Sequence, residues 1–183
     1  ETKPEKAIKL EKDTLAQIET ITVDNARLVS NLHANLGGLY RMNGHPDLAR
    51  EHMEKSISLL DQFNLLHIND SIPQIANYAM FLTEQQEPER GISELQKLSG
   101  IIKEYHSDDC LDYAKVQETL GTIYLMTANL PQAKTHFKKA FKIYEKIWAD
   151  EPEMIEAKYQ EIQELYPQIG FCIGKNLSGL LTK

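Results

Sequence analysis

The sequence predicts an all-α protein built from stacked pairs of antiparallel helices. Three stretches of the chain, 33–40, 75–82 and 117–124, align without gaps when the sequence is shifted by 42 residues. Within and around them the apolar residues recur three and four positions apart, which is the spacing of a helix with one buried face. A fixed repeat of this length indicates supersecondary units that bury their apolar faces only by stacking on their neighbours.

Each unit divides into two helices at a short breaker. The breakers at 43–46, 85–88 and 128–131 all carry a proline close to the start of the second helix. Proline is tolerated there because the first helical N–H has no partner within the helix. The predicted repeats are 30–63, 72–105 and 114–147.

Small residues at equivalent positions predict that the two helices of each unit cross closely. A glycine inside a helix costs about 1 kcal/mol relative to alanine, so its placement there implies a compensating contact. Bulky residues one turn away would then fill the space between the helices. The predicted crossing residues are Gly37, Ala79 and Gly121 on the first helices and Ala49, Gly91 and Ala133 on the second helices.

The two ends of the chain extend the pattern. Running the repeat backwards predicts that 4–20 is the second helix of a unit whose first helix is missing from this chain. Running it forwards predicts a further first helix at 152–166. The repeat then fails, and 168–181 carries one apolar stripe, so we interpret 152–183 as a degenerate repeat or capping helices. We expect a single solenoid over 1–183 with eight or nine helices.

The bulk composition favours a protein-binding or structural role over nucleic-acid binding. The formal net charge is −7, whereas nucleic acid is bound mainly through clustered Lys and Arg. The two cysteines, Cys110 and Cys172, lie far apart, so we predict unpaired thiols buried as small apolar groups and a cytoplasmic location. No stretch has the ~20 apolar residues of a membrane span. The chain begins at Glu1 without a methionine, so we expect a longer parent protein whose targeting signals are not visible.

Two of the repeats carry a recognisable motif. Leu36-Gly37-x-x-Tyr40 is followed by Ala49-x-x-x-Met53, and the third repeat has the same residue classes in 120–137. This pattern resembles the tetratricopeptide repeat. The usual unit has 34 residues, and the longer unit here resembles the 42-residue repeats of kinesin light chains and related bacterial proteins.

The resemblance covers 4–166 and implies a right-handed α-α superhelix. Its concave wall would be made by the first helices of successive units. The tryptophan of the family pattern is absent, because His33, Ile75 and Gln117 stand in its place. The resemblance also implies a non-enzymatic scaffold that binds proteins or peptides and needs no cofactor.

An asparagine just before the Leu-Gly pair hydrogen-bonds the backbone of an extended peptide in the long-repeat relatives. Asn35 and Asn77 match that position here, and Thr119 does not. In the alternative interpretation each amide caps or bridges the neighbouring repeat. The chaperone-binding members clamp a C-terminal carboxylate with a lysine and asparagines, but this sequence has Ala34 and Gly38 there, so a carboxylate clamp is not expected.

Further side chains fall on the predicted concave wall. An amide can donate to and accept from a peptide backbone, and methionine gives an adaptable surface, although it also fills cores. Met42 and Met126 belong to this wall by register. The predicted peptide-binding residues are Asn31, Asn35, Arg41, Asn77, Met80, Glu84, Lys115 and Glu118.

Other polar clusters receive structural interpretations. The six histidines show no paired spacing on one helix face, so we predict structural or solvent roles and no metal site. Asp108, Asp109 and Asp112 lie at a predicted helix start, where carboxylates favour the helix dipole, and we interpret them as capping residues rather than cation ligands. Lysines recur every four residues from Lys134 to Lys146. They form either a solvated convex face or a docking surface for an acidic partner.

Three classes of function are compatible with these patterns. The first is the peptide- or protein-binding scaffold, with no nucleic-acid partner. The second is the peptide-sensing domain of a larger bacterial regulator, which a helix-turn-helix region in the parent would favour. The third is an enzyme, but the sequence shows no nucleophile-base pair, phosphate loop or metal signature. Self-association through the exposed end of the incomplete first repeat is a further structural alternative.

Overall fold

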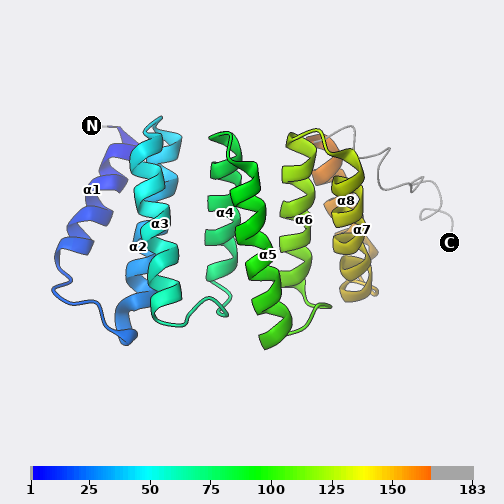
Figure 1. Cartoon of the computed structure of the whole chain (residues 1–183), viewed down its shortest axis with the longest axis horizontal. Helices are drawn as coiled ribbons and strands as arrows, with labels where there is room; N and C mark the ends of the chain where they lie inside the picture. The colour runs from blue at the N-terminus through cyan, green and yellow to red at the C-terminus, as the bar shows by residue number, and fades with distance from the viewer. Residues whose placement is uncertain (1, 166–183) are drawn as a thin grey trace. The chain divides into compact units, whose positions relative to one another are not determined.

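The computed structural model describes residues 2–165, and within that range it contains eight α-helices and no strand (Figure 1). The predicted fold class, an all-α arrangement of antiparallel helix pairs, is confirmed. The helices are α1 Lys3–Ala16, α2 Val23–Met42, α3 Pro46–Gln62, α4 Ser71–Glu84, α5 Pro88–Tyr105, α6 Leu111–Met126, α7 Leu130–Ile147 and α8 Pro152–Leu165.

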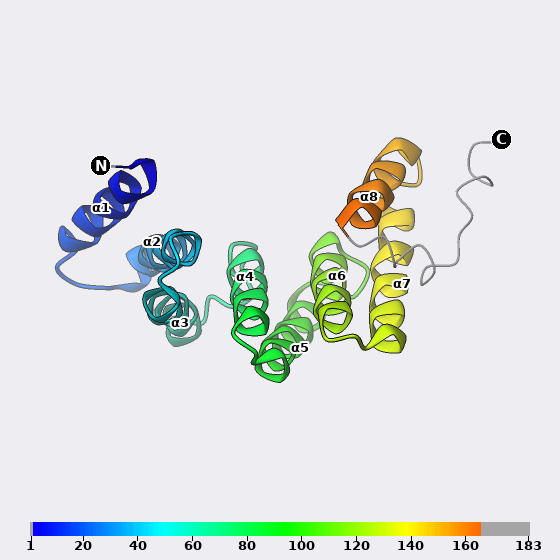
Figure 2. The ribbon, with the colours of Figure 1, turned by 90° about the horizontal axis from the view of Figure 1, so that it is seen from above.

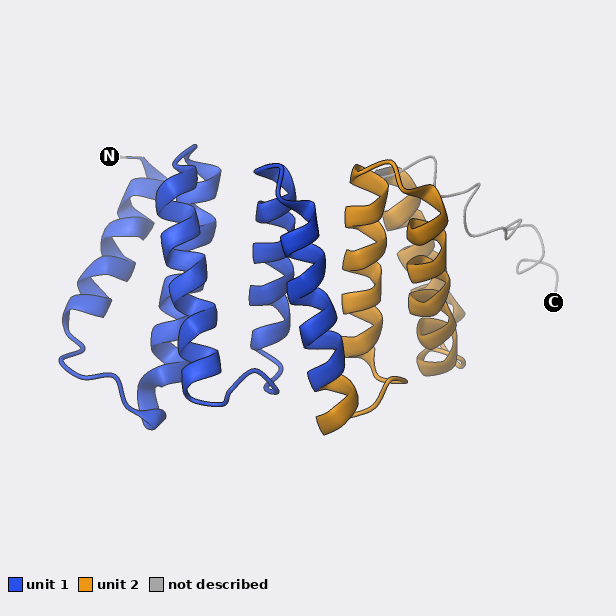
Figure 3. Cartoon of the chain, viewed as in Figure 1, with its two compact units in different colours: residues 1–101 blue, residues 102–183 orange. Residues whose placement is uncertain are grey.

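The chain divides into two compact units, Glu1–Ile101 and Ile102–Lys183 (Figure 3). The division falls inside α5. The expectation of a single solenoid over 1–183 stays a prediction. The predicted capping helix at 168–181 and Cys172 lie outside the described residues.

Unit 1 is organised around the helix pair α2 and α3, which lie side by side in both views (Figures 1 and 2). Its core joins Leu36 and Tyr40 of α2 to Met53 of α3 and to Phe81 and Leu82 of α4, all of them buried. Helix α1 covers one end of this core with two partly buried apolar side chains, Ile8 and Leu15. Burial of these apolar surfaces is the main force that holds the helices of the unit together.

Unit 2 repeats the same arrangement with α6 and α7 as its helix pair. Phe137 and Phe141 of α7 are buried, together with Leu120 of α6. Tyr159 brings α8 into the unit, because its ring stacks on that of Phe141 with centroids 4.0 Å apart. Ile162, one turn later on α8, is also buried.

The turns between first and second helices share one backbone conformation. Gly44, Gln86 and Ala128, which are equivalent in the repeat, all have positive φ, at 74°, 65° and 58°. This left-handed residue ends each first helix, and the next N–H then closes the turn on a carbonyl of the last helical turn. These closing bonds are His45 N to Tyr40 O (2.9 Å), Glu87 N to Leu82 O (2.8 Å) and Asn129 N to Tyr124 O (2.7 Å). The predicted breakers are therefore confirmed.

The predicted close crossings are also confirmed. A Cβ added to Gly91 would lie 2.7 Å from the carbonyl oxygen of Ala79, so α4 and α5 approach at backbone distance. A Cβ on Gly121 would lie 2.9 Å from the ring of Phe137. The glycines let the facing helices pack closely against each other. This packing offsets the conformational cost of glycine within a helix.

The prediction that aspartates cap the start of α6 is wrong for the N-cap position. The N-cap is Cys110, whose Sγ accepts a hydrogen bond from Tyr113 N at 3.5 Å and donates to Ser107 O at 3.1 Å. Cys110 is therefore a partly exposed capping thiol and not the buried apolar residue expected from the sequence.

The neighbouring carboxylates bind lysines instead of capping the helix. Asp109 pairs with Lys146 of α7, and the Lys146 ammonium lowers the pKa of Asp109. Asp108 lies 3.5 Å from Lys103 Nζ. Only Asp112 lies in the first turn of α6, as the dipole argument expected.

Candidate functional site

Polar side chains join α2 to α4 in unit 1 by a regular spacing. Each pair connects a residue of α2 to the residue 43 positions later, which lies on α4 or at its N-cap. The hydrogen bonds run from Arg27 Nε to Asp70 Oδ2 (2.6 Å), from Gln74 Nε2 to Asn31 Oδ1 (2.5 Å) and from Arg41 Nε to Glu84 Oε2 (2.8 Å). We call these contacts the α2–α4 polar pairs.

The polar pairs fix the alignment of the two helices more than they stabilise them. Arg27 holds the pKa of Asp70 below its ordinary value by hydrogen bonding, and Asn31 adds a second bond to the same carboxylate. Exposed ion pairs contribute only about 0–1 kcal/mol to stability, and the Arg27 side chain is mostly exposed. The pairs therefore act chiefly to hold one register between α2 and α4.

This series of pairs is interrupted between Asn31 and Arg41. The residue 43 positions after Ala34 is Asn77, and alanine has no polar group to offer its amide. The side chain of Asn77 is exposed and makes no hydrogen bond with any residue in 2–165. One turn further along α2 is Gly38, where an added Cβ would meet no atom within 4 Å. The small residues thus leave an opening opposite an unpaired amide.

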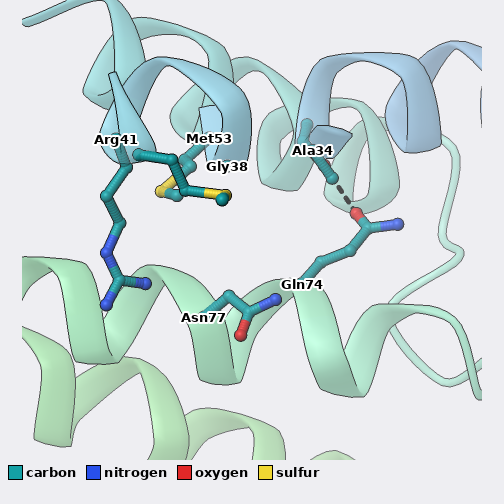
Figure 4. A pocket seen from close by; sticks show the side chains of 8 residues that line it. Ala34, Gly38, Arg41, Met53, Gln74 and Asn77 are labelled. Carbon is teal, nitrogen blue, oxygen red and sulfur yellow. Dashed lines mark hydrogen bonds between the residues drawn. The ribbon is translucent and has the colours of Figure 1, made fainter. Parts of the chain in front are cut away.

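The opening is a pocket of about 170 Å³ between α2 and α4, with α3 behind it. In Figure 4, Ala34, Gly38 and Arg41 come from α2, while Gln74 and Asn77 come from α4 and face them. The residues that line the pocket are Ala34, Gly38, Arg41, Met42, Met53, Ser56, Gln74 and Asn77.

A buried hydrogen-bond network forms the floor of this pocket. Gln74 Oε1 accepts from the hydroxyls of Ser56 at 2.5 Å and Ser30 at 2.8 Å. The exposed fractions of Ser30, Ser56 and Gln74 are 0%, 1% and 9%. Because the Gln74 amide nitrogen donates to Asn31, both ends of this amide are held and its orientation is fixed. Polar groups this deep are retained only when they are paired, so the network makes a rigid floor.

The rim of the pocket carries no uncompensated charge. The Arg41 guanidinium forms two bonds to the carboxylate of Glu84. Met42 lies beside it with 81% of its surface exposed. A ligand in the pocket would therefore meet apolar side chains, the free amide of Asn77 and the ion pair of Arg41 with Glu84.

Two other predicted residues of unit 1 have different surroundings. Asn35 Nδ2 donates to Glu11 Oε1 at 3.0 Å and so bridges α1 to α2, as in the alternative interpretation of this amide. Met80 is partly buried on α4. Neither lines the pocket, and their assignment to peptide binding stays a prediction.

The remaining predicted residues, Lys115 and Glu118, belong to unit 2. The Glu118 carboxylate accepts from the hydroxyl of Tyr144 at 2.6 Å and binds Lys158 Nζ at 2.9 Å. Burial alone would lower the pKa of Lys158, but the hydrogen bond and charge of Glu118 raise it. Lys115 lies 3.8 Å from Asp112 and lines a separate pocket of about 280 Å³ that also contains Trp148. Glu118 is thus already engaged in packing α6, α7 and α8.

Sequence reasoning missed the floor of the unit 1 pocket. Ser30, Ser56 and Gln74 are ordinary polar residues in amphipathic helices, and nothing in their own repeat marks them. A comparison of the chain with itself at a shift of 43 would have paired Arg27 with Asp70 and Arg41 with Glu84. Contacting residues differ by 43, whereas equivalent residues differ by 42.

Two further properties bear on the chemistry of the chain. Within residues 2–165, no three His, Cys, Asp or Glu side chains gather as ligands for a metal ion. None of the helices in this part of the chain has the length and apolar character needed to cross a membrane.

Comparisons with known proteins agree with the observed helix pairs. Residues 71–146 match a family model described as a tetratricopeptide repeat. No match to the chain was found among curated proteins. Among solved structures, the crystal structure of BtubC (BKLC) from P. vanneervenii is similar, with a TM-score of 0.68 and 19% sequence identity over 78% of this chain. The match spans 56% of the length of that structure, and at this identity it shows the fold alone.

Proposed function

Because this chain contains tetratricopeptide repeats, we propose that it is a non-enzymatic scaffold that binds a protein or an extended peptide segment. The binding surface is the face of unit 1 formed by α2 and α4. Tetratricopeptide repeats serve as protein-interaction modules, and stacked repeats present extended binding surfaces of this kind.

The observation that carries the proposal is the unpaired amide of Asn77 beside the pocket. Its neighbours along α4, Gln74 and Glu84, both bind α2, whereas Asn77 faces Ala34. An amide can accept from a peptide N–H and donate to a peptide C=O, so it can pair with the backbone of an extended segment whatever its sequence. The buried network of Ser30, Ser56 and Gln74 fixes the floor of the opening beside it.

The test begins with a selection of random peptides displayed on phage against the immobilised full chain. An enriched peptide is then synthesised and titrated calorimetrically into the wild type and four variants, Asn77→Ala, Asn35→Ala, Thr119→Ala and Lys138→Ala. We expect Asn77→Ala to raise its Kd roughly 2- to 13-fold, because one hydrogen bond contributes about 0.5–1.5 kcal/mol. Asn35→Ala should have a smaller effect, because Asn35 is already bound to Glu11.

Thr119→Ala is the matched control, since Thr119 is the equivalent residue of the third repeat and lies in unit 2. It should leave the Kd unchanged. The proposal would be overturned if no peptide were enriched, or if Asn77→Ala bound the enriched peptide as tightly as the wild type. A Kd that rose only in Lys138→Ala would move the site to the basic face of α7.

A further inference from the structure

We infer that the pocket beside Gly38 accepts one uncharged aliphatic side chain, about the size of leucine, from the bound peptide. This inference rests on the proposed function and names the residue type that the site selects. Gly38 is its specificity-determining residue.

Gly38 keeps the pocket open. An added Cβ at this position would meet no atom within 4 Å, so the glycine is not required for a close helix approach. The equivalent residues of the other two repeats are Met80 and Thr122, which both carry side chains. A methionine at position 38 would extend into the space that the pocket occupies. The pocket therefore exists because this one repeat lacks a side chain there.

The size of the pocket suits a single medium-sized side chain. Its volume is about 170 Å³. An apolar cavity of about 150 Å³ holds one benzene molecule, so this pocket has room for a leucine-sized group. Alanine would leave most of the space unfilled and lose the dispersion contacts with its walls.

The lining excludes charged side chains. Met53 and Ala34 supply apolar carbon, and Arg41 is already neutralised by Glu84. Gln74 uses both ends of its amide for Ser56, Ser30 and Asn31. A carboxylate or ammonium in the pocket would lose its hydration without gaining an ionic partner, and burial of an unpaired charge is strongly unfavourable. Charge complementarity therefore favours a neutral occupant.

Asn77 explains why the occupant belongs to a polypeptide. Its free amide lines the same pocket as the apolar walls, so one ligand can place a side chain in the opening and a peptide group against the amide. A hydrocarbon alone would leave the exposed amide bonded only to water. The combination of apolar walls and one free amide matches an amino-acid residue within a chain.

The experiment uses N-acetyl-leucine N-methylamide, which carries a leucine side chain between two peptide groups. It is titrated into the ¹⁵N-labelled full chain, and the backbone amide of Gly38 and the side-chain amide of Asn77 are followed by NMR. The alanine, aspartate and lysine derivatives are titrated in parallel. We expect saturable shifts at both signals with the leucine derivative, and binding about tenfold weaker or undetectable with the other three.

Gly38→Met should abolish the shifts at the Asn77 side chain. This variant is expected to fold, because methionine is a better helix former than glycine and its Cβ meets no neighbour. Thr122→Met is the matched control, since it places the same side chain at the equivalent position of the third repeat in unit 2. It should leave the titration unchanged.

Two results would overturn the inference. One is equal binding of the aspartate or lysine derivative, and the other is unchanged leucine binding in Gly38→Met. If phage-selected peptides bind through Asn77 but tolerate Gly38→Met without loss of affinity, the inference fails while the proposed function stands. If no displayed peptide binds, the proposed function fails, and the leucine derivative reports on the pocket by itself.

Discussion

The Nδ1 atoms of His33 and His52 lie 2.8 Å apart and join α2 to α3. Unit 2 repeats this contact between α6 and α7, where His136 Nδ1 lies 2.9 Å from Gln117 Oε1. In both pairs the histidine of the second helix stacks on a tyrosine of the first, with ring centroids 5.4 Å and 5.3 Å apart. A polar contact therefore joins the two helices in both pairs.

These contacts predict that the protein loses stability in mild acid. Burial, followed by the charges of His52 and Lys55, lowers the pKa of His33 to about 4. Burial and then the charge of Lys139 lower the pKa of His136 to about 4. The ordinary value is 6.5, so between pH 6.5 and about 4 the unfolded chain binds protons that the folded chain does not. The free energy of unfolding should therefore fall as the pH falls through this window and stay nearly constant just above it.

Urea denaturation at several pH values measures this dependence. Carboxyl groups titrate mainly below about pH 5, so the range between 6.5 and about 5 reports chiefly on the histidines. His33→Gln copies the residue found at Gln117 and keeps a hydrogen-bond partner for His52. Its unfolding free energy should depend less steeply on pH than that of the wild type. Identical slopes for the two proteins would show that His33 does not carry the effect.

The left-handed residues of the turns predict a stabilising substitution. Ala128 has φ of 58°, a conformation that costs an L-residue with a Cβ roughly 1–2 kcal/mol, whereas Gly44 occupies the equivalent position without that cost. Ala128→Gly should raise the free energy of unfolding by about 0.5–1 kcal/mol, since part of the gain is offset by the greater freedom of glycine in the unfolded chain.

Gly44→Ala is the reciprocal change and should destabilise the protein by about 1 kcal/mol. Thermal denaturation of the two variants measures both effects. Neither residue lines the pocket, so binding of the leucine derivative should be unaffected. Changes of the same sign in both variants would contradict the turn assignment.

Much of the fold could be predicted because the sequence pattern of each helix and each breaker occurs in three repeats. The breakers ending in Pro46, Pro88 and Pro131 and the glycines at the helix crossings have the same local cause in every unit, so one explanation covers all three. The alignment of neighbouring first helices could not be predicted in this way. Asn31 contacts Gln74, 43 residues later, and a comparison at a shift of 42 aligns residues that play the same role rather than residues that touch.

The candidate site was less predictable because its residues are defined by what surrounds them. Asn35 and Asn77 are equivalent in sequence, but their surroundings differ. The amide of Asn35 donates to Glu11 of α1, whereas Asn77 lies opposite Ala34, which has no polar side chain to pair with it. The cap of α6 shows the same limit. Several residues at its start have side chains that can cap a helix. Asp109 pairs instead with Lys146, which lies far along the chain, and so the sequence around α6 does not reveal it.

The floor of the pocket predicts an energetic coupling between Ser56 and Gln74. Their hydrogen bond is 2.5 Å long and buried, and Ser30 contacts both residues, so removing either partner breaks part of a shared buried network. Ser56→Ala and Gln74→Ala should each destabilise the protein by about 1–3 kcal/mol, and the double variant should lose less than the sum. A double-mutant cycle in urea measures the difference. Ser58→Ala on the exposed side of α3 is the control and should have little effect.

Two glycine-to-alanine changes distinguish a close helix crossing from an open pocket. Both residues lie inside helices of unit 1, where alanine is the better helix former by about 1 kcal/mol. At Gly38 the new methyl group meets no atom within 4 Å, so Gly38→Ala should raise the free energy of unfolding by about 0.5–1 kcal/mol.

At Gly91 the methyl group would lie 2.7 Å from the backbone oxygen of Ala79, which cannot rotate away. Gly91→Ala should therefore lower the free energy of unfolding by about 1–3 kcal/mol despite its better propensity. Urea denaturation compares the two directly, and a stabilising effect of Gly91→Ala would show that α4 and α5 do not cross at this residue.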